Sequence, residues 1–169
     1  MKNHFILFFV LLPTFWISAQ NVTITTAKIT FEFPSKNVKG TIGGFESTSK
    51  IDWENPSNSV FQGSVESATL DTNNGLRNWS LRSSRYFSTK TYPRISFTSK
   101  EVRKKGNTWV VLGDLTLKGI KKPFRIDFEQ TNGKLKGRGE LYSSDFNIKI
   151  KKQREDNLVL VYFELEIAK

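Results

Sequence analysis

The feature that most constrains this chain is a repeated alternation of apolar and polar residues in short segments. Residues 22–33 show the alternation first, and the last segment places apolar residues at every second position, at Val159, Val161, Phe163, Leu165 and Ile167. A period of two residues is typical of a β-strand that buries one face. Asn132-Gly133, between two such segments, is typical of a hairpin turn. The pattern therefore predicts an antiparallel, all-β fold.

About eight such segments, interrupted by one stretch of different character, set the expected architecture. Residues 71–90 do not alternate, and the spacing of Leu76, Trp79 and Leu81 predicts a short helical insertion. Strands without intervening helices indicate an up-and-down barrel or a sandwich. We favour a barrel, because closure removes exposed sheet edges and glycines within the segments allow strong curvature. No repeat or linker divides the chain, so one domain is expected.

The first 19 residues have the layout of an export signal. Lys2 precedes the apolar run Phe5–Trp16, and the segment ends in the small residues Ser18-Ala19. This order is typical of a secretory signal peptide. The run has 12 residues, fewer than the ~20 that a spanning helix needs, although an uncleaved membrane anchor stays open as the alternative. We expect residues 1–19 to be removed and residues 20–169 to form a periplasmic or secreted domain.

Few side chains are left for catalysis. The chain has no Cys, and its single His, His4, lies in the segment that is expected to be removed. Disulfides, thiolate metal sites, Ser-His-Asp triads and imidazole ligands are then excluded. A carboxylate enzyme that uses Asp71, Glu140 or Asp145 is the remaining catalytic hypothesis. We expect a non-catalytic protein with no metal and no cofactor.

The net charge of +10, from 26 Lys and Arg against 16 Asp and Glu, favours anionic partners, although high solubility explains it equally well. An exported protein rarely meets nucleic acid, so we expect none as a partner. Anionic lipids, glycans and envelope polymers remain. Two basic runs, residues 100–105 and 149–154, lie near expected hairpin tips. Solvated loops explain these runs, and peripheral contact with an anionic membrane is the alternative.

Several blocks of residues, in order along the chain, resemble the YceI-like family. The blocks are Val38-Lys39-Gly40, Leu70-Asp71-Thr72, Arg77, Leu81-Arg82-Ser83, Tyr86-Phe87, Tyr92-Pro93, residues 95–99, residues 113–123 and Ser144-Asp145-Phe146. The resemblance implies an extended, lipocalin-like antiparallel β-barrel of eight strands that encloses a long apolar ligand. That ligand is typically a polyisoprenoid such as a quinone or a prenyl phosphate, and it is bound without catalysis.

The chain departs from the family pattern in the helical insertion. Asn78 and Ser80 stand where relatives tend to have Asp and His. A headgroup contact made by those two side chains in relatives would therefore be lost or altered in this chain.

Apolar residues on the inward face of the predicted strands are the candidate ligand contacts. The resemblance makes them, together with Trp79, Leu81 and Phe87 of the insertion, the wall of an apolar tunnel. Taken alone, the same pattern is explained by an ordinary filled core. The strand residues in this set are Ile29, Phe31, Phe33, Phe97, Trp109, Val111, Leu115, Phe124, Ile126, Phe128, Val161 and Phe163.

Three arginines near the helical insertion, Arg77, Arg82 and Arg85, are the candidate clamp for an anionic headgroup. A guanidinium binds phosphate through two parallel hydrogen bonds. The alternatives are salt bridges to Asp71 or Asp145, or simple solvation. We expect Asp71 to be a turn or helix-cap residue and Asp145 to be structural.

The outward face of the last segment is unusually apolar, with Leu158, Leu160 and Tyr162. A homodimer contact or cover by the helical insertion would explain it. The main rival to a lipid-binding protein is a solidly packed envelope or stress-related protein that binds anionic surfaces through its basic face.

Overall fold

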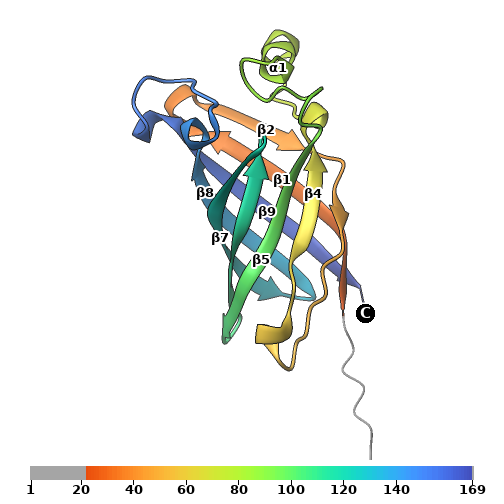
Figure 1. The fold of residues 1–169 in the computed structure, drawn as a ribbon. Coiled ribbons are helices and arrows are strands. Elements are labelled where there is room, and N and C mark those ends of the chain that lie inside the picture. The colour runs from red at the N-terminus through yellow and green to blue at the C-terminus, as the bar shows by residue number, and fades with distance from the viewer. Residues whose placement is uncertain (1–21, 169) are drawn as a thin grey trace, which may run out of the picture.

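The computed structural model describes residues 22–168, so the predicted signal segment 1–19 lies outside the described residues. Within this part the chain forms nine β-strands and one α-helix, α1 (Gly75–Arg82) (Figure 1). The strands are β1 (Thr23–Phe33), β2 (Val38–Ile42), β3 (Glu46–Ser47), β4 (Gln62–Glu66), β5 (Arg94–Lys105), β6 (Thr108–Leu117), β7 (Ile120–Thr131), β8 (Lys134–Tyr142) and β9 (Leu158–Ala168). Short 3₁₀ turns lie between some of them, at Pro34–Lys36, Pro56–Asn58, Ser67–Thr69, Ser143–Phe146 and Glu155–Asn157.

All nine strands belong to one antiparallel sheet in the order β2-β1-β9-β8-β7-β6-β5-β4-β3. The sheet curls strongly into a half-barrel. Two isolated bridges tie it to the connections: Val22, just before β1, pairs with Ile51 after β3, and Thr41 of β2 pairs with Asp71 before α1. The predicted all-β antiparallel architecture is confirmed. The expected count of eight strands is one too low, because β3 has only two residues and so shows no alternation.

Two glycines of β8 lie beneath phenylalanine rings of the neighbouring strand. A side chain at Gly137 of β8 would collide with the ring of Phe128 on β7, and one at Gly139 would collide with the ring of Phe124. The rings can turn inward over β8 because these two positions carry no Cβ. The inner face of β7 therefore places aromatic rings on the concave side of the sheet.

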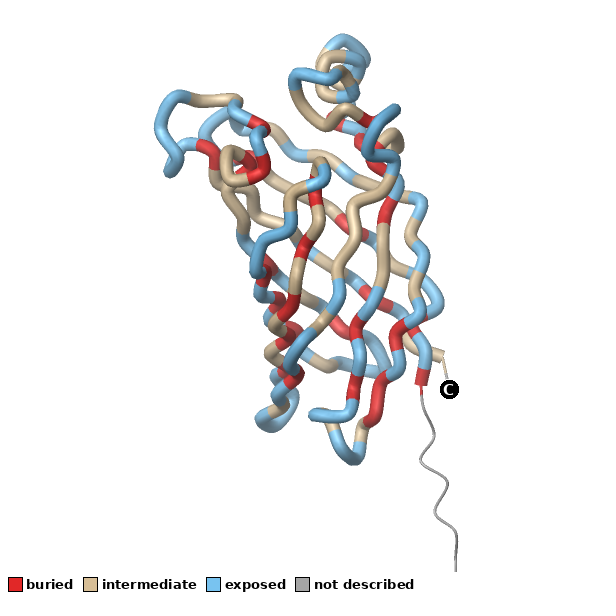
Figure 2. Tube along the Cα trace, viewed as in Figure 1, coloured by how far each residue is buried: buried red, intermediate tan, exposed pale blue. Residues whose placement is uncertain are grey.

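An aromatic cluster closes the barrel at the end opposite α1. Trp109 is 0% exposed, and its ring meets Trp53 edge-on at 5.1 Å between centroids. Phe61 stacks on Phe128 at 5.6 Å. In Figure 2 many of the buried stretches follow the strands toward this end. We call these four residues the aromatic plug.

The helix α1 begins where the sequence predicted a helical insertion. The side chain of Asn74 caps it by accepting a hydrogen bond from the backbone N–H of Arg77. Asp71 fixes the preceding turn, because its carboxylate accepts hydrogen bonds from the backbone of Asn73 and the side chain of Asn78. These bonds, that of Asn78 first, lower the pKa of Asp71. In the structure Asp71 therefore holds the turn that precedes α1.

Candidate ligand-binding cavity

The curled sheet encloses one large apolar cavity of about 610 Å³. Its wall comes from the inward-facing side chains of the strands, from α1 and from the connections beside it. Most of the predicted wall residues line it: Ile29, Phe31, Phe33, Leu81, Phe87, Phe97, Leu115, Phe124, Ile126, Phe128, Val161 and Phe163. The interpretation of these residues as a filled core is therefore wrong for this part of the barrel.

The cavity extends along the strands. On β1 its wall runs from Ile24 to Phe33, and at ~3.3 Å per residue this distance is about 30 Å along the strand. Phe61 and Phe128 of the aromatic plug close one end. At the other end the exposed Lys36 and the half-buried Arg77 line the cavity, so this end, beside α1, is open to solvent.

Three predicted wall residues lie outside the cavity. Trp109 and Val111, both 0% exposed, pack in the solid end of the barrel, whereas Leu115, further along the same strand, lines the cavity. Trp79 is 73% exposed on the outer side of α1. Helical periodicity explains this position, because Arg77 and Leu81 lie four residues apart and share the inner side.

The three predicted headgroup arginines separate in the structure. Arg77 lines the cavity at its open end. Arg82 and Arg85 do not line it; Arg82 lies in the last turn of α1, and the guanidinium carbon of Arg85 lies 5.6 Å from the ring centroid of Tyr86. Lys36, which is not among the predicted headgroup contacts, lines the same end. No local pattern marks a lysine in a connection between two strands as a cavity residue.

Other residues line the cavity but are not among the predicted wall residues, although the alternation of apolar residues could have indicated them. Val38, Ile42 and Val159 line the cavity and lie in the strands β2 and β9. Extending the inward face along each of these strands, two residues at a time, would find them.

Asp145 is part of the connection between β8 and β9. Its carboxylate accepts hydrogen bonds from Nε and Nη2 of Arg154 at 2.9 and 2.7 Å, and the same guanidinium stacks 3.7 Å from the ring centroid of Tyr142. The hydrogen bond from Arg154 lowers the pKa of Asp145 and raises that of Arg154. Asp145 therefore pairs with Arg154 and with none of the three candidate headgroup arginines.

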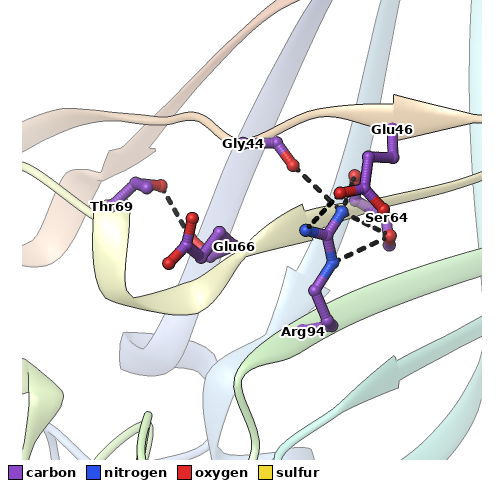
Figure 3. Close-up of polar contacts among 6 residues, drawn as sticks. All are labelled: Gly44, Glu46, Ser64, Glu66, Thr69 and Arg94. Carbon is purple, nitrogen blue, oxygen red and sulfur yellow. Dashed lines mark hydrogen bonds and ion pairs between the residues drawn. The ribbon is translucent and has the colours of Figure 1, made fainter.

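A polar cluster around Arg94 holds the edge strand β3 beside β4 and β5 (Figure 3). Arg94, at the start of β5, donates to the hydroxyl of Ser64 at 2.7 Å and to the carbonyl of Gly44 at 3.0 Å. It also pairs with Glu46 of β3 at 3.1 Å. Ser47, next to Glu46, lines the cavity. The cluster thus holds β3 and β4 in place as the wall on this side.

The lining is poor in groups for acid–base chemistry. Among residues 22–168, Lys36 and Arg77 are the charged side chains that line the cavity, and Asp71, Glu140 and Asp145 lie outside the lining. The described residues contain no group of three or more potential metal ligands. No helix among them has the length and apolarity to cross a membrane.

Comparisons with known proteins agree with the geometry. The sequence model of the family described as "YceI-like domain" matches residues 17–168. A UPF0312 protein of Photorhabdus laumondii is 36% identical over 136 residues, which are 72% of this chain and 71% of that protein. Protein YceI of Escherichia coli O157:H7 is 33% identical over 120 residues, which are 65% of this chain and 63% of that protein, so the match spans less than two thirds of its length.

Solved structures share the fold. BcnA of Burkholderia cenocepacia has a TM-score of 0.73 at 21% identity, covering 85% of this chain and 96% of that one. A structure described as a polyisoprenoid binding domain from Saccharophagus degradans has a TM-score of 0.56 at 15% identity, covering 87% and 96%. At these identities the likeness shows the architecture alone.

Proposed function

Because the chain belongs to the YceI-like domain family, we propose that it holds a long-chain isoprenoid-type lipid in its cavity without changing it chemically. A quinone or a prenyl phosphate is the expected ligand. The observation that carries this proposal is the elongated apolar cavity, which is closed at one end and open beside α1. The polyisoprenoid-binding description of the Saccharophagus degradans domain supports the choice of ligand class.

The lining supports one orientation of such a ligand. An apolar tail is favoured toward the aromatic plug, because every apolar side chain it covers leaves water. The polar headgroup belongs at the open end, where Arg77 and Lys36 line the cavity. Arg77 can donate two parallel hydrogen bonds to a phosphate, and Lys36 adds a positive charge.

The competing functions have less support. The solidly packed envelope protein requires a filled lumen, and the cavity of about 610 Å³ removes that premise. The carboxylate enzyme requires acids that face a substrate, and Asp71, Glu140 and Asp145 are absent from the lining. The apolar run Phe5–Trp16 supports placing the protein in the periplasm or outside the cell.

Mass spectrometry of lipids extracted from the protein purified from its native source tests the proposal. We expect a co-purifying isoprenoid lipid, and binding of an added prenyl phosphate or quinone to the delipidated protein. The variant Val161→Trp replaces a small side chain of β9 in the cavity wall by an indole ring, and it should reduce the amount of bound lipid. Tyr162→Trp is the matched control, because the neighbouring Tyr162 is exposed and lies outside this cavity.

Two results would count against the proposal. One is a native protein that carries no long apolar molecule and takes up none that is added. The other is equal lipid occupancy in Val161→Trp and in the parent chain, which would place the lipid outside the cavity.

A further inference from the structure

Two large apolar side chains of α1 face solvent at the open end of the cavity. Leu76 is 78% exposed and Trp79 is 73% exposed, more than any other large hydrophobic residue of the described chain. They are three residues apart and so share one face of the helix. Arg77, Ser80 and Leu81 line the cavity, so the helix has an inner side and an exposed apolar side.

The surface around this pair is strongly basic. Ten Lys and Arg against four Asp and Glu lie in the connections at this end, which are residues 34–37, 71–93, 118–119 and 143–157. One of the acids, Asp145, is already paired with Arg154. Within the described part of the chain, Arg82, Arg85 and Lys90 form no ion pair, so their charges are available to an external partner.

The small apolar area of Leu76 and Trp79 favours a membrane over a protein as the partner. A stable protein interface buries ~800 Å² on each partner, and two side chains on an eight-residue helix supply only a small part of that area. Binding to a membrane surface requires less buried apolar area. Tryptophan is favoured at the level of the lipid headgroups, and lysines and arginines near an anionic leaflet are attracted to it.

We propose that α1 docks the open end of the cavity on an anionic lipid bilayer. Leu76 and Trp79 insert among the headgroups, and Arg82, Arg85 and Lys90 lie against the phosphates. This inference rests on the proposed function: docking would bring the opening of the cavity, beside Arg77, to a bilayer that supplies the lipid. Its physical basis, an exposed apolar pair within a basic surface, is independent of any cavity ligand.

Co-sedimentation with vesicles tests the docking. The purified chain is mixed with vesicles of phosphatidylcholine alone, or of equal parts of phosphatidylcholine and phosphatidylglycerol. We expect binding to the mixed vesicles, weakened by salt, and a blue shift of tryptophan emission that the variant Trp79→Phe lacks. Removing both apolar side chains in L76A/W79A should weaken binding by about tenfold or more.

The matched control is Val60→Ala. Val60 is 41% exposed and precedes β4 at the closed end, so its truncation should leave vesicle binding unchanged. Binding by L76A/W79A equal to that of the parent would overturn the docking, as would equal losses in both variants. Absence of binding to the mixed vesicles, with circular dichroism showing a folded protein, would overturn it as well.

Lipid extraction from the same samples separates this inference from the proposed function. Leu76 and Trp79 do not line the cavity, so L76A/W79A should retain its cavity lipid. A chain that retains cavity lipid but never binds vesicles overturns the docking alone. A chain that binds vesicles through α1 but never holds a cavity lipid overturns the proposed function alone.

Discussion

Replacing Trp109 by alanine should destabilise the protein far more than the same replacement at Trp79. Trp109 is fully buried, packs edge-on against Trp53 at 5.1 Å and lies beneath the ammonium of Lys104 at 4.7 Å. Truncating a buried tryptophan removes about 3–5 kcal/mol of stability, and each aromatic pair contributes ~0.5–1.5 kcal/mol of its own. We therefore expect a loss of about 4 kcal/mol or more.

Trp79 provides the contrast within one residue type. It is 73% exposed on α1, and surface substitutions of this kind change stability by about 0.5 kcal/mol or less. Both numbers refer to the chain without lipid, because a ligand that binds only the folded state would stabilise each variant by mass action.

Urea unfolding of delipidated protein, followed by far-ultraviolet circular dichroism, measures the difference. With a slope of ~2 kcal/mol per molar urea, the unfolding midpoint of Trp109→Ala should fall by about 2 M, while that of Trp79→Ala should stay within ~0.3 M. A loss below ~1 kcal/mol at Trp109, or equal losses at both positions, would refute the reasoning that the aromatic plug is a packed core.

Three further predictions test other parts of the structure. Gly137→Val should destabilise the fold by about 1–3 kcal/mol, measured by urea unfolding, because the added side chain collides with the phenylalanine ring above it. The pKa of Asp145 is lowered in the folded state by Arg154, so this pair stabilises the protein above the ordinary pKa of an aspartate, ~3.9, and the stabilisation is lost as the pH falls through the lower folded value. The difference in unfolding free energy between the parent and Asp145→Asn should therefore shrink on acidification, and a constant difference would contradict the pairing. Arg77→Gln should weaken binding of a prenyl phosphate by about tenfold or more and leave that of the corresponding alcohol nearly unchanged, while Arg82→Gln should change neither in the absence of membranes; isothermal titration calorimetry measures both.

The sequence predicted the faces of the strands well, because strand periodicity is a local property. Val161 and Phe163 of β9 were placed inward from their spacing alone, and both line the cavity. The two-residue strand β3 was missed, since its existence depends on pairing with Ser64 and Gly63 of β4 and not on any pattern of its own.

The alternation of residues does not predict how far the cavity extends along the barrel. Trp109 and Leu115 lie on the same face of β6, and alternation treats them alike. One is buried in the aromatic plug and the other lines the cavity. The difference arises because Trp53 and Phe61, from distant parts of the chain, fill the lumen only at the level of Trp109. Long-range neighbours of this kind leave no trace in a single segment.

The separation of the arginines follows from the same distinction between local and long-range order. Helical spacing does predict that Arg77 and Leu81 share one side of α1. It cannot predict which side faces the barrel, because that depends on how the turn held by Asp71 and Asn78 directs the helix. Once that turn fixes α1, the rotation of the helix about its axis sets which side chains face the cavity and which face solvent. It turns Arg77 toward the cavity and, by the same geometry, leaves Trp79 exposed. The polar end of the cavity and the apolar surface beside it are therefore two consequences of one local structure.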